Sequence, residues 1–377
     1  MNNNKSEIFK RVVSATIIAI LFSKFLVLIP LDFGFFSSNK SGKINQFDIY
    51  TDLIKRSDNI TYEDNIVIVT IPEKAGRLEL TDALNLLAEC EPAAISMDIY
   101  LKGKTDSLTD SRLIEAIKKN KNLILPCFID KNNDTIPFLV KPGTSGTEKG
   151  FVNLDCQDGE NSIIRTFVPH YLSGSDTLHC LALEAVKLVY PEKIQILKKR
   201  NSSHEYINYM RDISSFSYTE IPYFKEKFKD KIIILGKESA EDTHHTPINN
   251  KLSGLKIHAY IASTVLMEDY IDRAPLWLVT ALTVLISLLF SYLSVLYAMR
   301  YGRFAGFLVR TSTYAFFFAF LISGFIIFYE YSYYVDSVWL LLCVAFSPWS
   351  LDIYYILDAI YNKIKKKINN MINDSNI

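Results

Sequence analysis

Four apolar stretches divide the chain into membrane-like and globular parts. They cover residues 12–31, 275–299, 304–329 and 335–351. Since about 20 apolar residues are enough to cross a bilayer, these stretches predict four transmembrane helices. The segment between the first two, residues 32–274, is long enough to bury a core of its own and predicts one folded domain.

The first stretch differs from the others because Lys24 interrupts it. Its length, and the lack of a clear small-residue cleavage site after it, favour an uncleaved anchor over a signal peptide. We expect the Lys24 ammonium group to extend to the membrane interface. The alternative is a lysine that pairs with a carboxylate inside the membrane.

Within residues 32–274, short apolar runs alternate with helical patterns. Such an alternation is typical of a parallel sheet whose strands are joined by right-handed helical crossovers. The sequence therefore predicts an α/β domain with a mainly parallel, Rossmann-like sheet flanked by helices. The predicted strands are 65–71, 92–100, 123–129 and 231–237, and the predicted helices are 79–90, 109–120, 177–190 and 254–268.

Two further elements are expected at the margins of this domain. Apolar residues recur at helical spacing over residues 44–59, which predicts a stalk helix that continues the first span and packs on the domain. Residues 150–155 and 162–168 flank Asp158-Gly159, a dipeptide typical of tight turns, and predict a β-hairpin.

Charge adds an orientation. The chain has 41 basic and 41 acidic residues, a balance that gives no indication of a nucleic-acid partner. Basic residues cluster near the ends of the spans, and such clusters face the cytoplasm. The tails 1–11 and 352–377 are therefore expected in the cytoplasm and residues 32–274 outside it. The orienting residues are Lys5, Lys10, Arg11, Arg300, Arg303, Lys363, Lys365, Lys366 and Lys367.

Four cysteines, Cys90, Cys127, Cys156 and Cys180, fall in the domain expected outside the cytoplasm. An oxidising compartment permits disulfides, but cysteines inside helix-like and strand-like runs are commonly free and buried. Their pairing stays open.

Candidate ligand-binding residues follow the predicted strands. Because ligands bind beyond the carboxyl ends of parallel strands, these polar side chains are expected to face one crevice. Arg165 is a further candidate, either for an anion or for an ion pair with an acid. No metal-ligand spacing, nucleophile signature or cofactor-binding loop is present, so we expect no metal, no cofactor and no catalytic residue. The crevice candidates are Glu73, Asp98, Asp242, His244 and His245.

Six segments in chain order resemble a known family. They read "FDIYTDLIKRSDN", "IVIVTIPEK", "EPAAISMDIYL", "GFVNLDCQDGENSIIRTFVP", "KIIILGKESAEDTHHTPI" and "GLKIHAYIASTVL". Together they resemble the type-2 CHASE domain, an extracellular sensory module of bacterial membrane receptors. The resemblance implies a sensory domain at the bacterial inner membrane. Matching positions are Asp98, Gly150, Asn153, Arg165, Asp242 and His258, whereas Glu73 stands where the family usually has an aspartate.

The resemblance also implies how the chain works. Members of the family usually carry a cytoplasmic output domain after three spans, whereas here residues 352–377 predict only a basic amphipathic helix. The expected function is a membrane sensor or accessory receptor that acts on a separate signalling protein. Its expected partners also include the lipid bilayer and a second copy of the chain, in a homodimer. The alternatives are a membrane-anchored, hydrolase-like enzyme and a structural subunit of an envelope complex.

Overall fold

The computed structural model describes residues 2–28, 45–57, 61–99, 101, 107–129, 135–137, 148–154, 163–173, 176–239, 242–249, 251–301 and 303–374. The chain divides into two compact units. One comprises Met1–Phe33 with Asp272–Ile377, and the other comprises Gly34–Ile271. Each unit is described here by itself.

The second unit is built on a mixed sheet with the strand order β10-β1-β11-β2-β3-β4, in which β5 also pairs with β3. All pairs are parallel except β3 with β4. This confirms the expected α/β domain with a mainly parallel sheet. The strands are β1 (Tyr62–Ile71), β2 (Ala94–Asp98), β3 (Leu123–Ile129), β4 (Thr135–Pro137), β5 (Lys149–Phe151), β10 (Asp212–Ser217) and β11 (Ile232–Lys237).

Both faces of the sheet are buried. Ile66 and Ile68 of β1 pack into one apolar cluster, whereas Val67 and Val69 pack into another on the opposite face. Successive side chains of a strand point to opposite faces, so an uninterrupted apolar run marks a strand covered on both sides. This is why the β-branched runs in the sequence located the central strands.

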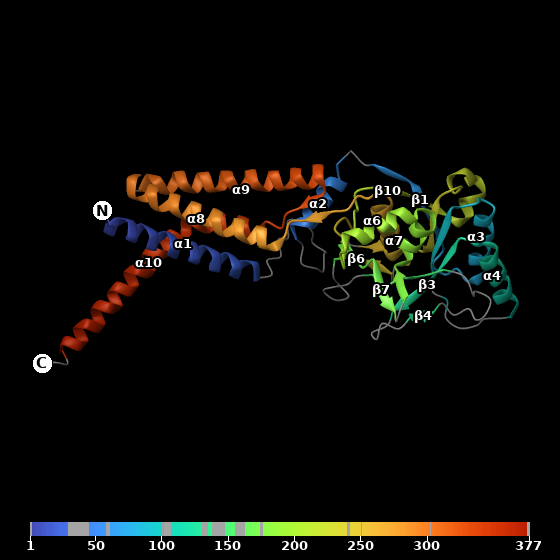
Figure 1. The fold of residues 1–377 in the computed structure, drawn as a ribbon, viewed down its shortest axis with the longest axis horizontal. Helices are drawn as coiled ribbons and strands as arrows, with labels where there is room; N and C mark the ends of the chain where they lie inside the picture. Colours follow the sequence, from blue (N-terminus) through green and yellow to red (C-terminus); the bar gives the residue numbers. More distant parts are fainter. Residues whose placement is uncertain are drawn as a thin grey trace. The chain divides into compact units, whose positions relative to one another are not determined.

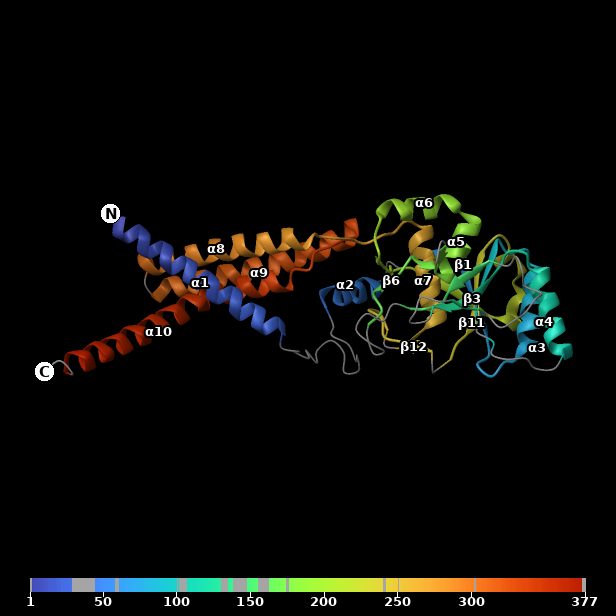
Figure 2. The same cartoon turned by 60° about the horizontal axis from the view of Figure 1, so that its bottom comes forward.

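Helices cover the two faces in separate groups (Figures 1 and 2). One face packs against α3 and α4, and the other packs against α5, α6 and α7. The helix α2 belongs to the same unit and buries Phe47, Tyr50 and Ile54; its link to the first span lies outside the described residues. The bounds are α2 (Gln46–Lys55), α3 (Arg77–Ala88), α4 (Ser107–Lys119), α5 (Leu181–Val189), α6 (Pro191–Arg200) and α7 (Gly254–Leu266).

The predicted hairpin around Asp158-Gly159 is wrong. Phe151 belongs to β5, which joins β3, whereas β6 (Thr166–Phe167) pairs with β9 (Glu205–Tyr206) in a separate two-stranded sheet. The turn dipeptide itself lies outside the described residues. A local turn signal carries no information on which strand each of its flanks will join.

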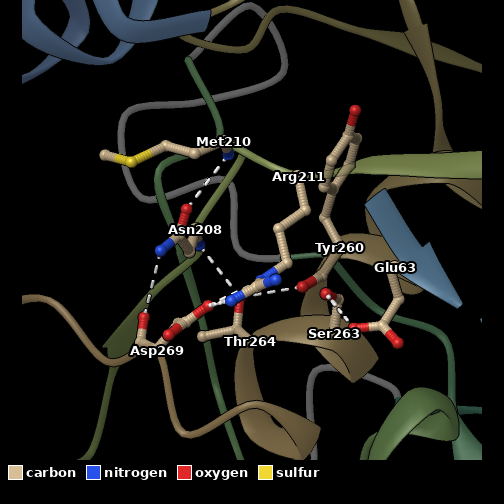
Figure 3. Close-up of polar contacts among 8 residues, drawn as sticks. All are labelled: Glu63, Asn208, Met210, Arg211, Tyr260, Ser263, Thr264 and Asp269. Carbon is tan, nitrogen blue, oxygen red and sulfur yellow. Dashed lines mark hydrogen bonds and ion pairs between the residues drawn. The ribbon is translucent and has the colours of Figure 1, made fainter. Parts of the chain in front are cut away.

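Polar contacts fix the carboxyl-terminal half of α7 to the rest of the domain (Figure 3). The hydroxyl of Ser263 donates to Glu63 of β1 at 3.2 Å, and the hydroxyl of Thr264 accepts from the backbone N–H of Asn208 at 2.9 Å. Just beyond the helix, Arg211 donates to the Asp269 carboxylate at 2.6 Å. Because most of these groups are buried, the contacts join this end of α7 to β1 and to the segment that precedes β10.

The first unit consists of helices that pack side by side (Figure 1). Val12 and Ala15 of α1 share an apolar cluster with Val295 of α8 and Leu351 of α10. The small strands β14 (Asp272–Arg273) and β15 (Tyr333–Tyr334) pair in parallel at one end. The helices are α1 (Asn2–Leu28), α8 (Leu276–Tyr301), α9 (Arg303–Tyr331) and α10 (Val338–Asp374).

Three helices of the described chain are long and apolar enough to cross a membrane: Leu276–Tyr301, Gly306–Tyr331 and Val338–Met371. The prediction of four such helices is therefore corrected to three. Residues 12–28 of the first stretch belong to helix α1; Lys24 interrupts their apolar run, and Lys10 and Arg11 precede it. Residues 29–31 of the predicted span lie outside the described residues.

Lys24 of α1 contacts an aromatic ring of α10. Its ammonium group lies over the ring of Trp339, 5.0 Å from the ring centre, in a cation–π contact. The expected position of this group at the membrane interface stays a prediction. The neighbouring Ser23 hydroxyl is 2.7 Å from the Cys343 sulfur, which ties α1 to α10. Helix α10 continues without a break across the predicted boundary between the last span and the basic tail.

Candidate functional site

Asp98 is the last residue of β2 and lies at the carboxyl end of the sheet. In the register of β2 with β11 it stands opposite Gly236. A Cβ atom at Gly236 would lie 2.5 Å from the Leu255 side chain and 3.3 Å from the Asp98 carbonyl oxygen. The missing side chain therefore lets α7 approach the strand end closely, and β2, β11 and α7 meet at this point.

The loop after β11 brings Asp242 and His244 to the same end of the sheet. The Asp242 carbonyl accepts from the backbone N–H of Gly254, the first residue of α7, at 3.2 Å. His244 Nε2 lies 3.1 Å from Asp242 Oδ1. His244 is itself fixed by the short antiparallel pairing of β12 (Thr243–His244) with β13 (Leu252–Ser253).

His258 completes the group from α7. Its side chain is almost fully buried, with 2 % exposure, and Nδ1 has no hydrogen-bond partner among the described residues. A buried polar atom without a partner is costly, so it marks a position where a ligand, a water or a proton is accommodated.

The other three side chains act electrostatically on Asp98. Burial is the main cause that raises the pKa of Asp98, and the nearby Asp242 carboxylate raises it further. His258 and His244 act in the opposite direction because a positive imidazolium favours the charged carboxylate. No described residue donates a hydrogen bond to the Asp98 carboxylate. We refer to Asp98, Asp242, His244 and His258 as the strand-end cluster.

A family model, the CHASE2 domain, matches residues 17–297. The chain belongs to the CHASE2 family. CHASE2 domains are sensory rather than catalytic, and they usually function in signalling receptors. Together with the three apolar helices, the match identifies a multi-pass membrane protein with a sensory domain. Neither the curated proteins nor the solved structures contain a match.

The other expected crevice residues of this CHASE2 domain are placed differently. Glu73 is exposed and accepts a hydrogen bond from Ser239, so it lies at the same sheet edge, between the ends of β1 and β11. His245 is held through its backbone, and its Nδ1 is buried without a partner among the described residues. Its backbone pairs with Ile163 and its carbonyl accepts from Ile164 N at 2.8 Å.

Arg165 serves a different purpose. Its Nε and Nη2 atoms each donate to the carboxylate of Asp48, at 2.8 Å, in a bidentate pair. Asp48 belongs to α2 and its side chain is 1 % exposed. The arginine therefore fastens α2 to the domain, which is the ion-pair alternative that the sequence had left open.

Sequence reasoning missed two features of the site. His258 matched the family but was not counted among the ligand candidates, because a histidine inside an apolar helix is commonly a packed core residue. Asp48 lies in the expected stalk helix, and no local pattern linked it to an arginine 117 positions away.

The Cys90, Cys127, Cys180 and Cys343 thiols are free and buried, whereas Cys156 lies outside the described residues. No group of three or more metal-ligating side chains gathers among the described residues.

Proposed function

We propose that this CHASE2 protein is an integral membrane sensor or accessory receptor whose strand-end cluster binds an extracytoplasmic ligand. The observation that carries the proposal is the Asp98 carboxylate, which is desolvated without a hydrogen-bond donor among the described residues. It faces a histidine of α7 with an unpartnered nitrogen. Two carboxylates and two imidazoles favour a ligand that presents hydrogen-bond donors or positive charge.

Helix α7 is the element that passes the signal on. Its first turn lies against Asp242 and its middle carries His258, so ligand contacts act on its amino-terminal half. The contacts of Figure 3 join its other end to Glu63 of β1 and to Asn208. Only residues 267–275 separate α7 from α8 in the chain. A shift of α7 is therefore delivered over a short connection to a membrane-spanning helix.

The orientation follows from the basic residues between α8 and α9. Arg300 ends one helix and Arg303 begins the next, and the positive-inside rule assigns this turn to the cytoplasm. The amino-terminal end of α8, and the sensory domain that precedes it, then lie outside the cytoplasm. This supports the bacterial inner membrane as the location, with the domain on its outer side.

The cytoplasmic end of α10 is the surface to which a partner binds. Its last turns combine lysines with exposed apolar side chains, a pattern that suits pairing with another helix. We propose a separate signalling protein, or a second copy of this chain, as that partner. The exposed apolar residues are Ile356, Leu357, Ile360, Tyr361, Ile364, Ile368 and Met371.

The ligand proposal is tested on the full-length protein in nanodiscs, incubated with the small-molecule fraction of spent growth medium. We expect this fraction to raise the melting temperature of the wild type but not that of Asp98→Asn, because the substitution removes the charge while keeping the shape. Glu220→Gln, an exposed position, is the control and retains the rise. An equal rise in Asp98→Asn contradicts a ligand at the cluster, and turnover of a compound that this substitution stops would favour an enzyme.

The orientation is tested by labelling Asn249→Cys and Asn370→Cys in intact cells with a membrane-impermeant thiol reagent. Asn249 is exposed in the loop after β12, and Asn370 is exposed near the end of α10. We expect labelling at residue 249 and not at residue 370, measured against the unsubstituted protein. The reverse pattern contradicts the orientation.

A further inference from the structure

One edge of the central sheet is open. Strand β10 stands at the end of the strand order, with β1 as its neighbour, and its two central residues, Ser214 and Ser215, are exposed. Within the described chain, only residues of β1 hydrogen-bond to the backbone of residues 213–216; they include the Thr70 hydroxyl, which donates to the Phe216 carbonyl at 3.4 Å. Alternate backbone groups of a strand point to opposite sides. The outer row of N–H and C=O groups of β10 therefore has no partner strand among the described residues.

The sequence of β10 lacks the features that usually protect a sheet edge. Edge strands are commonly very short or carry lysine or proline, which hinder pairing with another chain. The opposite edge follows this rule, because β4 has three residues and ends in Pro137. Strand β10 has six residues and contains neither lysine nor proline. Its one charged residue, Asp212, forms an ion pair with Lys55 of α2. This edge is therefore suited to accept a further strand.

An apolar surface adjoins the open edge. The chain leaves β10 through a short helical turn, η1 (Tyr218–Tyr223), and the side chains of Tyr223 and Phe224 at its end are exposed. The ring centre of Phe224 lies 5.6 Å from that of Phe216, so Phe224 stands next to β10. Exposed aromatic residues are enriched in protein–protein interfaces because they bury a large apolar area in a complex. They would add apolar contacts to a chain that pairs with β10.

A second copy of this chain fits the edge. A strand that pairs with its own copy across a twofold axis runs antiparallel to it, and the residue beside the axis lies opposite itself. The axis that pairs the most residues of β10 passes Ser214 or Ser215. Neither arrangement places Asp212 opposite its own copy, and no other charge lies on the strand. Like charges therefore do not oppose the pairing, whereas a strongly charged partner strand would find no opposite charge along this edge.

We propose that the sensory domains of two copies join through β10, so that their two sheets continue into one across a twofold axis. Backbone hydrogen bonds between the two β10 strands hold the copies together, and Tyr223 and Phe224 pack at the margin of the interface. The interface uses none of the residues of the strand-end cluster. It is a partner surface of the sensory domain, distinct from the one proposed at α10.

The first test is the mass of the full-length protein in mild detergent, measured by light scattering over a dilution series. We expect the wild type to be a dimer. Ser215→Lys is expected to dissociate at a protein concentration at least about tenfold higher, because it brings two ammonium groups together across the axis. The Ser215 side chain is exposed, so the substitution keeps the fold. Ser203→Lys, at an exposed serine outside β10, is the control and dissociates like the wild type. A monomeric wild type, or equal dissociation of the two variants, overturns the proposal.

The second test locates the axis by cysteine cross-linking in membranes. Because the residue beside the axis meets its own copy, we expect Ser214→Cys or Ser215→Cys to form a covalent dimer with a short bifunctional thiol reagent. The unsubstituted protein and Ser203→Cys are the controls, and both are expected to stay monomeric on denaturing gels. The absence of a cross-link at both positions of β10, or equal cross-linking of Ser203→Cys, overturns the proposal.

A variant of α10 separates this interface from the one proposed at the cytoplasmic end. Ile364→Lys places a charge among the exposed apolar residues of α10. If Ile364→Lys dissociates the dimer and Ser215→Lys does not, the copies pair through α10 and the proposal is overturned. None of these measurements uses a ligand. Failure at β10 is thereby distinguished from failure of the ligand site, which is tested by the rise in melting temperature.

Discussion

Two aspartates of the sensory domain are paired by the fold to very different extents. Asp48, with 1 % exposure, accepts hydrogen bonds from Nε and Nη2 of Arg165 at 2.8 Å, and its Oδ2 also accepts one from the backbone N–H of Asn45 at 2.9 Å. Asp98 is half-buried and receives no hydrogen bond from a described residue, and desolvation raises its pKa. The first carboxylate is paired by the fold itself, whereas the second has only the electrostatic influence of Asp242 and two histidines.

This difference separates a structural role from a sensory one. A buried charge that is fully paired specifies how elements pack, and removing its partner is costly. A buried charge that is poorly paired destabilises the resting state and is relieved by a proton or a ligand. The Asp48–Arg165 pair therefore belongs to the scaffold, whereas the strand-end cluster has the properties expected of the proposed ligand site.

The largest effect on stability is expected when Asp48 loses Arg165, its ion-pair partner. Arg165→Met leaves Asp48 buried and uncompensated, so we expect the domain to lose about 3–5 kcal/mol of stability. Pulse proteolysis of the full-length protein in urea measures it. Arg56→Met, which removes an exposed partner of Asp52, is the control and is expected to cost less than about 1 kcal/mol. Equal losses in the two variants would refute the structural role of Arg165.

Much of the scaffold could be predicted from the sequence because its signals are local. The runs at β1, β2, β3 and β11 are apolar without alternation, which is the pattern of strands buried on both faces. The order in which they pair is not a local property. Strand β11 lies between β1 and β2, although about 130 residues separate it from β2 in the chain.

The candidate site was predictable only in part for the same reason. Asp98 and Asp242 follow apolar runs, so they could be expected at strand ends. Arg165 pairs with Asp48 only because α2 packs on the domain. His258 likewise lies near Asp98 only because of how α7 packs against the sheet. Similarly, the dipeptide Asp158-Gly159 indicated a turn but could not indicate that β6 would pair with β9.

The second expected effect has the opposite sign. Asp98→Asn removes a desolvated carboxylate to which no described residue donates a hydrogen bond. At neutral pH we therefore expect the free energy of unfolding to rise by about 1 kcal/mol. The pKa of Asp98 is higher in the folded state than in the unfolded chain, where it is about 3.9. The wild type therefore binds the proton more tightly when folded, and it loses stability relative to the variant as the pH rises between these two pKa values.

Pulse proteolysis of both proteins from pH 4 to pH 8 measures that difference, since carboxylates common to both cancel. The gain of the variant is expected at the alkaline end of the range and is expected to vanish at the acidic end. If Asp98→Asn is less stable than the wild type at every pH, favourable interactions outweigh the desolvation of the Asp98 carboxylate, and the prediction is wrong.

A smaller effect is expected from the coupling between Asp98 and α7. In a double-mutant cycle of Asp98→Asn with His258→Phe, we expect an interaction free energy of about 0.5–1 kcal/mol, because His258 acts electrostatically on the Asp98 carboxylate. The same cycle with Arg165→Met in place of His258→Phe is the reference and is expected to be additive within about 0.5 kcal/mol. Equal coupling in both cycles would contradict a separate strand-end cluster.

The smallest effect on stability is expected at Gly254, the first residue of α7. A Cβ atom there would lie 2.8 Å from Asp242 Oδ2 and 3.1 Å from Oδ1, so Gly254→Ala displaces that carboxylate. Because the side chain of Asp242 is half exposed, it can rotate into solvent at little cost, and we expect a change of less than about 0.5 kcal/mol. The contact of Asp242 with His244 and its influence on Asp98 are lost by the same movement. Gly254→Ala should therefore fold like the wild type, yet lose most of the rise in melting temperature that spent medium produces. If that rise is retained while Asp98→Asn abolishes it, the ligand contacts Asp98 without Asp242, and the cluster is reduced to Asp98 and the histidines that face it.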